Sequence, residues 1–164
     1  VSLLNDCKYG YDAQPNGLRL TLLRSPLWPD PNCDRGLHYL TYALYPHSGG
    51  WQQAKTHKKG YELNRPLIAQ SLELSNAESR KPSLSQSFFS GFADNLIFMA
   101  FKQSEDSPDH WIMRCYEAIG QPVKTMLQST LPLEPLDMVD GLERSVGRES
   151  EEMRGWEVRS QCWG

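Results

Sequence analysis

The first fifty residues alternate between short apolar runs and polar stretches rich in turn formers, a pattern typical of β-strands. Residues 18–24 (LRLTLLR) alternate apolar and polar side chains until Leu23 interrupts the period of a half-buried strand. The Asn16-Gly17 pair before this run tolerates the positive φ of a tight hairpin turn. A polar loop with three prolines follows at residues 25–36, and residues 37–47 return as a tyrosine-rich strand. The pattern predicts a hairpin, a long loop and a further strand, and indicates nothing about chemistry.

The next stretch predicts the end of a first domain. Side chains in residues 50–64 recur at roughly helical spacing, which predicts one or two helical turns. Residues 66–69 (PLIA) are predicted as the last strand of this unit. Residues 74–86 (LSNAESRKPSLSQ) are rich in serine and charge without an apolar period, which is typical of a linker. We therefore expect domains at residues 1–73 and 87–164.

The second unit reads as a small antiparallel β-sandwich. Residues 95–102 are apolar almost throughout, which favours a strand that is buried on both faces. Further strands are expected within residues 111–118, 123–130, 136–139 and 156–163, which gives five or six in all. The charged residues 141–155 are expected to form an exposed excursion. Gly and Pro occur at short intervals between strand-like stretches that are rich in aromatic residues, so the predicted fold class is all-β.

Charge and cysteine content narrow the function classes. A net charge of −3 gives no electrostatic footprint for nucleic acid or for an anionic membrane surface. No apolar run is long enough to span a bilayer, and the first residues lack a signal pattern. Cys7, Cys33, Cys115 and Cys162 are scattered, so two disulfides are conceivable, but a reduced set and a cytoplasmic location are the better expectation. They lack the short spacing of a structural zinc site.

Longer motifs carry a family resemblance. In order, they are LLNDCKYGYD at residues 3–12, LRLTLLRSPLWPDP at 18–31, the D-x-G-x-H of 34–38, YALYPHSG at 42–49, GYELN at 60–64, SFFS at 87–90, CYEAIG at 115–120 and WEVRS at 156–160. Together they resemble the C-terminal β region of the family 38 α-mannosidases, in particular their bacterial and cytosolic branch. The resemblance runs over nearly the whole chain.

The resemblance implies a fold for each unit and assigns catalysis to another domain of the parent enzyme. Residues 1–73 would be the tail of a β super-sandwich similar to the galactose mutarotase fold, and residues 87–164 a compact terminal β-sandwich. The parent enzyme would be a zinc-dependent, retaining α-mannosidase, whose nucleophile and metal ligands belong to an N-terminal catalytic domain. We therefore expect a fragment without catalytic residues, metal ligands or activity of its own. Its expected partners are that catalytic domain and a mannose-containing oligosaccharide, and exposed strand edges make a homo-oligomer a further expectation.

The residues themselves single out no catalytic site. A glycosidase needs two carboxyl groups across one sugar, and no spacing here marks such a pair. Asp30 and Asp34 lie in the proline-rich loop, where aspartate commonly accepts hydrogen bonds from nearby backbone amides. No HxH, HExxH or GxSxG motif occurs. The tryptophans are expected mostly in the core, and only Trp28, in the polar loop, is a candidate for stacking on a sugar.

The polar residues after the first strand are the best candidates for an auxiliary site. Their side chains suit sugar hydroxyls, but Asp6 and Lys8 could equally pair with each other or bind loop backbone. The resemblance implies that loops of this region pack near the active-site mouth, and Arg35-Gly36 matches an Arg-Gly loop of the Golgi-type branch. The predicted substrate-cleft or interdomain residues are Asn5, Asp6, Lys8, Tyr9, Trp28, Asp34, Arg35, Gly36 and His38. The alternatives are a stand-alone carbohydrate-binding β-sandwich and a purely structural or oligomerisation module.

Overall fold

The computed structural model describes residues 1–71, 85–147 and 150–164. It divides into two compact units, Val1–Glu73 and Leu74–Gly164, which are described separately. Regular structure in the described residues is almost entirely antiparallel β-strand, which confirms the predicted all-β class. Most of the predicted linker, residues 74–84, lies outside the described residues. No described helix has the length and apolar character that a membrane crossing requires.

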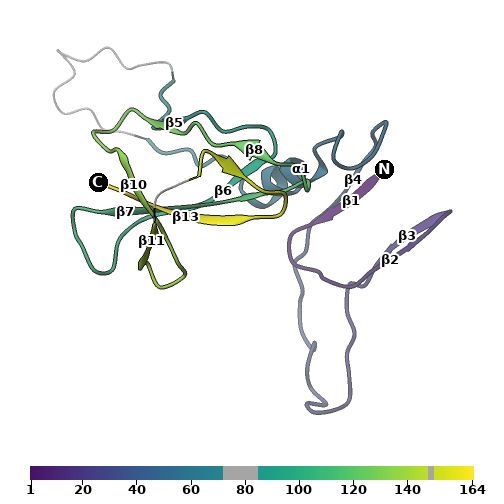
Figure 1. Ribbon diagram of the computed structural model, residues 1–164. Helices are drawn as coiled ribbons and strands as arrows, with labels where there is room; N and C mark the ends of the chain where they lie inside the picture. The colour runs from purple at the N-terminus through teal and green to yellow at the C-terminus, as the bar shows by residue number, and fades with distance from the viewer. Residues whose placement is uncertain (72–84, 148–149) are drawn as a thin grey trace. The chain divides into compact units, whose positions relative to one another are not determined.

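The first unit contains two separate strand pairs. β1 (Ser2–Asn5) pairs antiparallel with β4 (Tyr42–Tyr45), so the start of the chain and the return of the long loop lie side by side. β2 (Tyr11–Gln14) and β3 (Gly17–Leu20) form the predicted hairpin, with Gln14 opposite Gly17. Figure 1 shows the two pairs and the segment between β3 and β4, which leaves them as a long excursion.

The hairpin differs in detail from the prediction. Neither Asn16 nor Gly17 has a positive φ. Pro15 occupies the first central position of the turn and fixes its own φ near −65°, which excludes the type I′ turn, since that turn needs a positive φ at both central residues. The strand expected over residues 18–24 ends at Leu20, because β2 supplies partners only from Tyr11 onward. The strand expected over residues 37–47 is likewise limited to β4, which matches the four residues of β1.

The helical prediction is confirmed, and the strand predicted after it is wrong. α1 spans Thr56–Asn64, within the residues whose spacing indicated a helix. Residues 66–69 form no strand, and the side chains of Leu67 and Ile68 are almost fully exposed. An apolar run becomes a strand only beside a partner strand, and no described strand pairs with these residues.

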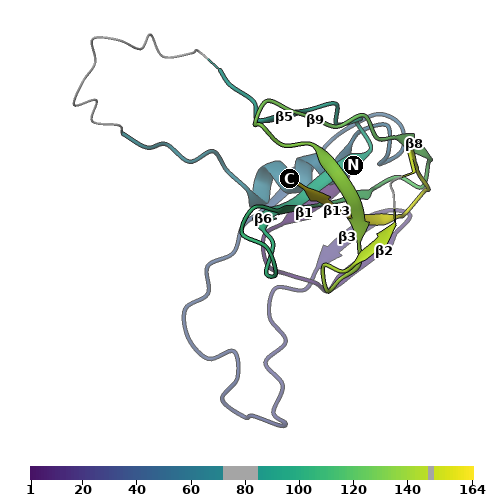
Figure 2. The same cartoon turned by 60° about the vertical axis from the view of Figure 1, so that its left-hand side comes forward.

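The second unit is built around a five-stranded antiparallel sheet. Its order is β11-β10-β13-β7-β6, and two short strand pairs, β5-β9 and β12-β8, accompany it. Figure 2 shows β5 beside β9. The strands are β5 (Phe89–Ser90), β6 (Leu96–Gln103), β7 (Trp111–Glu117), β8 (Val123–Lys124), β9 (Gln128–Ser129), β10 (Pro135–Val139), β11 (Ser145–Gly147), β12 (Glu152–Met153) and β13 (Val158–Trp163).

The core of this unit lies on both faces of the central strands. One buried cluster joins Leu96, Cys115 and Met153, and a second joins Ile112, Val139 and Cys162. Since side chains alternate along a strand, Ile112 and Cys115 of β7 point to opposite faces. The sheet is therefore covered on both sides at its centre, while its edge strands are more open.

Two predictions about this unit are wrong. Residues 95–102 are not buried on both faces, since only Leu96 and Ile97 are buried and Phe98 and Met99 are exposed. The physical reason is that β6 is an edge strand, with a register shift between Phe98 and Ala100. Residues 141–155 are not a wholly exposed excursion either. They include β11 and β12, and Met153 of β12 is fully buried.

Candidate functional site

A polar turn, residues 5–10, connects β1 to β2 and contains four of the predicted site residues. The side-chain oxygen Oδ1 of Asn5 accepts hydrogen bonds from the backbone N–H groups of Cys7, at 3.0 Å, and of Lys8. Asn5 therefore closes the turn on itself, a use of asparagine that its short amide side chain allows. Asn64, at the end of α1, donates its Nδ2 hydrogen to the carbonyl oxygen of Asn5 at 3.0 Å. At the other end of the turn, the Gly10 carbonyl accepts the N–H of Thr21 at 2.8 Å.

Asp6 joins the polar turn to the returning end of the long loop. Its carboxylate oxygen Oδ2 accepts the N–H of Thr41 at 3.0 Å, and its own N–H donates to the Thr41 carbonyl at 3.1 Å. The Thr41 N–H and, next, the side chain of Cys7 lower the pKa of Asp6. Of the alternatives for Asp6, the binding of loop backbone is therefore the one that the structure shows.

The polar turn also borders a shallow cavity of about 270 Å³, lined by Asn5, Asp6, Cys7, Lys8, Tyr9 and Tyr11. Tyr9 is almost fully exposed and offers a free aromatic face. Small-molecule sites usually enclose roughly 300–1,000 Å³ and bury most of their ligand. The cavity is thus slightly smaller than that range, so it could form only part of a binding site.

The long loop, residues 25–38, is closed at its base by Asp34. Oδ2 of Asp34 accepts the N–H of Ser25 at 2.9 Å, and the Asp34 carbonyl lies 2.9 Å from Nε2 of His38. Asp30 accepts the N–H of Asn32 at 2.8 Å. The turn role expected of both aspartates is confirmed. The Ser25 N–H is the main cause of a lowered pKa for Asp34, and the charges of His38 and Lys8 lower it further.

Apolar and aromatic side chains of the long loop point to solvent. Trp28 is 83% exposed, and Leu27 and Leu37 are similarly open. Figures 1 and 2 both show this part of the chain standing away from the strand pairs of its own unit. Arg35 donates its backbone N–H to Asn32 at 3.3 Å, and Gly36 has a φ of 130°. A loop that is fixed at its base and exposes several apolar side chains has the character of a contact surface.

The structure thus brings only some of the predicted residues together. Asn5, Asp6, Lys8 and Tyr9 line one cavity. Asp34, at the base of the long loop, does not line this cavity. The residues Trp28, Arg35, Gly36 and His38 do not line the cavity. Their assignment to a substrate cleft or an interdomain contact stays a prediction.

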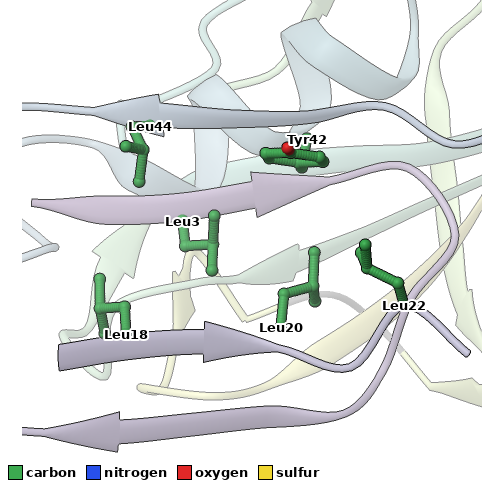
Figure 3. A pocket seen from close by; sticks show the side chains of 6 residues that line it. All are labelled: Leu3, Leu18, Leu20, Leu22, Tyr42 and Leu44. Atoms are coloured by element: carbon green, nitrogen blue, oxygen red, sulfur yellow. The ribbon is translucent and has the colours of Figure 1, made fainter.

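Sequence reasoning missed an apolar groove in the first unit. The groove has a volume of about 280 Å³ and is lined by Leu3, Leu18, Leu20, Leu22, Tyr42 and Leu44. Figure 3 shows Leu18 and Leu20 rising from β3 toward Leu3 of β1. The alternation of residues 18–22 did signal an apolar strand face, but which strand it would oppose depends on distant residues. Tyr42 and Leu44 are more than half exposed, so the groove is open.

The remaining acidic side chains outside the charged surface runs have structural partners. Asp12 forms a salt bridge with Arg19 across the β2-β3 hairpin, at 2.5 Å. Glu117 is buried and accepts four hydrogen bonds. No three His, Cys, Asp or Glu residues of the described ranges are placed to hold a metal ion.

Two of the tryptophans that were expected in the core, Trp51 and Trp156, are exposed. Trp163 is buried, and Trp111 stacks on Phe101 with ring centroids 5.1 Å apart. Trp156, which was expected in the core, is 62% exposed. Its backbone has a φ of 64° in the turn that precedes β13.

Two family models match the chain. Residues 1–32 match the model described as "Glycosyl hydrolases family 38 C-terminal domain". Residues 95–160 match the model described as "Glycosyl hydrolases family 38 C-terminal beta sandwich domain". No solved structure matches the chain.

Curated relatives match most of the chain. Alpha-mannosidase 2C1 of Homo sapiens is 40% identical over 146 residues, which are 88% of this chain and 14% of the relative. Alpha-mannosidase G of Dictyostelium discoideum is 35% identical over 87% of this chain and 13% of its own length. The Saccharomyces cerevisiae alpha-mannosidase is 30% identical over 89% of this chain and 14% of its own length. The chain therefore spans about one seventh of the relatives that it matches. It belongs to glycosyl hydrolase family 38, of which it represents the C-terminal β region.

Proposed function

We propose that this chain is the C-terminal β region of a zinc-dependent, retaining α-mannosidase that removes terminal α-linked mannose. In this proposal it supports the catalytic domain and shapes one side of its substrate cleft. The observation that carries the proposal is the sequence match to human alpha-mannosidase 2C1. The match covers 88% of this chain but only 14% of the human protein. This coverage supports the assignment of the chain to one region of a larger enzyme.

The first unit supports an interdomain role through its open apolar surface. A pair of two-stranded sheets with an exposed leucine-lined groove is marginal in water by itself. Burial of apolar side chains stabilises a contact by roughly 25 cal/mol for each Å² removed from water. We assign the groove to packing against the preceding β structure of the same enzyme, and the long loop with Trp28 to the neighbouring catalytic domain.

The polar turn supports a contribution to the cleft. Because Asp6 and Asn5 are held by backbone hydrogen bonds, their remaining lone pairs have fixed directions. Lys8 and Tyr9 add a cation and an aromatic face at the same cavity. These groups suit the outer hydroxyls of a mannose-containing oligosaccharide. The bound zinc would orient sugar hydroxyls in the catalytic domain, and the side chains of the turn would only position the remainder of the substrate.

The cysteines support a reducing compartment. None of the four cysteines forms a disulfide. Cys115 and Cys162 are buried in two different core clusters. Burial raises the pKa of the Cys162 thiol, and the nearby charge of Asp137 adds to this effect. A protonated, buried thiol reacts slowly with oxidants. We propose a cytoplasmic location on this basis.

The proposal is tested with an aryl α-mannoside. The full-length enzyme is compared with the enzyme truncated before Val1 and with the 164-residue chain, each with zinc or cobalt added. We expect turnover by the full-length enzyme only. Turnover by the 164-residue chain that survives repurification and disappears in Asp6→Asn or Asp34→Asn would place a complete site in these residues and overturn the proposal.

A further inference from the structure

One face of α1 lines a cavity of about 400 Å³ in the first unit. The lining residues are His57, Gly60, Tyr61, Asn64 and Arg65, which recur at three- and four-residue intervals and therefore share one side of the helix. The volume lies within the range of roughly 300–1,000 Å³ that is usual for small-molecule sites. The cavity shares no lining residue with the polar turn or with the apolar groove.

Gly60 leaves room at the middle of this helix face. A Cβ at Gly60 would meet no atom within 4 Å, so the space over the helix backbone is open there. Asn64 fixes the helix against β1, because its Nδ2 group donates to the carbonyl oxygen of Asn5 at 3.0 Å and to that of Gly60 at 2.9 Å. The floor of the cavity is therefore a helix surface that its contact with β1 holds in place.

Tyr61 supports the charged group that borders the cavity. The guanidinium of Arg65 lies over the Tyr61 ring, with Cζ 5.3 Å from the ring centroid. A cation–π contact of this kind uses the face of the guanidinium and leaves the N–H donors in its plane available. Among the described residues, no carboxylate pairs with the Arg65 guanidinium and no oxygen accepts a hydrogen bond from it. A planar cation with five N–H donors is thus presented at an open cavity.

The segment around the cavity is basic, although the chain as a whole has a net charge of −3. Four of residues 55–65 are basic and only Glu62 is acidic. Glu62 pairs with Lys59 at 2.7 Å, and none of the described lining residues is acidic. The carbonyl end of α1 carries roughly half a negative charge, which the full positive charge of Arg65 outweighs. The local charge therefore favours an anionic ligand.

We propose that this cavity binds a small organic oxyanion, either a phosphate monoester or a carboxylate, which Arg65 holds through paired N–H···O hydrogen bonds. The guanidinium fits both groups, because two of its parallel N–H bonds can meet two oxygens of one ligand. Tyr61 is a positioning residue, because its ring supports the guanidinium. The cavity volume leaves space for the organic part of the ligand. Anion binding here requires no catalytic step, so it is independent of the proposed mannosidase function.

The test is calorimetric titration of the full-length enzyme with inorganic phosphate, glycerol 3-phosphate and succinate, which together distinguish a phosphate from a carboxylate ligand. Arg65→Gln is expected to weaken binding at least about tenfold, since hydrogen bonds from a charged donor are lost. Arg65→Lys keeps the charge without the planar pair of donors, so its affinity should lie between the two. Gly60→Leu introduces a good helix former that fills the cavity and should abolish binding. Arg24→Gln is the matched control, because Arg24 is an exposed arginine of the same unit that does not line the cavity.

Amide NMR spectra of the 164-residue chain locate the site, and the signals of Gly60 and Arg65 are expected to move most as phosphate is added. The site is overturned if none of the three anions binds, or if Arg65→Gln and the wild type bind them equally. Binding by the 164-residue chain that the full-length enzyme lacks would assign the cavity to a contact within the enzyme and would overturn the site as well. Circular dichroism of each variant controls for folding. Hydrolysis of the aryl α-mannoside is measured alongside, so the site and the proposed function fail separately.

Discussion

The replacement Glu117→Gln tests how far one buried carboxylate holds the C-terminal unit together. Glu117 is 1% exposed, and its two oxygens accept two hydrogen bonds each. Oε1 faces Asn95 and Ile119, and Oε2 faces Gly120 and Trp156. Glutamine keeps the shape of the side chain but replaces one oxygen with an NH₂ group. In either orientation, that group faces two donors.

The expected cost follows from those two donors. A buried donor left without an acceptor costs about 1–3 kcal/mol. Two such donors give a loss of roughly 2–6 kcal/mol, and the low end applies if water reaches the partly buried N–H of Gly120 or Trp156. A domain of this size has a total stability on the order of 5–15 kcal/mol, so the loss is large enough to measure.

The assay is urea unfolding followed by tryptophan fluorescence, in which the buried Trp163 reports on the second unit. Glu134→Gln is the matched control, because the side chain of Glu134 is exposed. We expect the control to change the unfolding free energy by less than about 0.5 kcal/mol. The reasoning is refuted if Glu117→Gln and Glu134→Gln have the same midpoint as the wild type.

The same carboxylate predicts a pH dependence. Burial alone would raise the pKa of Glu117, but the N–H groups of Trp156 and Ile119, the Asn95 amide and the Gly120 N–H together lower it below its ordinary value. A group with a lower pKa in the folded state contributes stability above its unfolded pKa, which is about 4.3 for glutamate. This contribution is lost as the pH falls through the folded value. The wild type should therefore lose more stability than Glu117→Gln between neutral and acidic pH.

Three further predictions concern other parts of the chain. Met153→Ala empties the middle of a buried cluster and should lower the unfolding free energy by about 2–5 kcal/mol in urea titrations. Asp34→Ala removes the acceptor for Ser25 at the base of the long loop, so limited trypsin digestion should cut that loop several-fold faster while the urea midpoint stays unchanged. Leu44→Lys should reduce the fluorescence of a bound apolar dye because it places charge in the groove, whereas Leu142→Lys, at an equally exposed leucine (66%), should leave it unchanged.

Predictions from sequence succeed where the physical cause is local. The hairpin between Tyr11 and Leu20 follows from alternation and from a turn of Pro, Asn and Gly, all within ten residues. The helix Thr56–Asn64 follows from spacing alone. The turn roles of Asp30 and Asp34 follow from the reach of a short carboxylate to nearby backbone amides.

The failures share a cause that is not local. The apolar residues 66–69 form no strand because no described partner strand lies beside them. Residues 141–155 are highly charged, yet Met153 is buried, because Arg159 holds this segment through the carbonyls of Ser150 and Glu152, at 2.7 and 2.9 Å. The conformation of Trp156 depends on Glu117, which lies 39 residues earlier. No local pattern contains these pairings.

The candidate site shows the same limit. The composition of residues 5–9 suggested a polar cluster, and the structure does gather all five of them around one cavity. Composition does not predict the hydrogen bond between the Asp6 carboxylate and the N–H of Thr41, which lies 35 residues away. Nor could the groove be predicted, because Leu3 and Leu44 meet only through the register of β1 with β4.

The most direct test of the central claim is reconstitution. The parent enzyme, truncated before Val1, is mixed with the purified 164-residue chain, and hydrolysis of an aryl α-mannoside is measured with zinc present. The account predicts that neither piece is active alone and that the mixture regains activity, which Leu44→Lys weakens because the groove is part of the contact. Full activity of the truncated enzyme without this chain would contradict the claim that these residues support the catalytic domain.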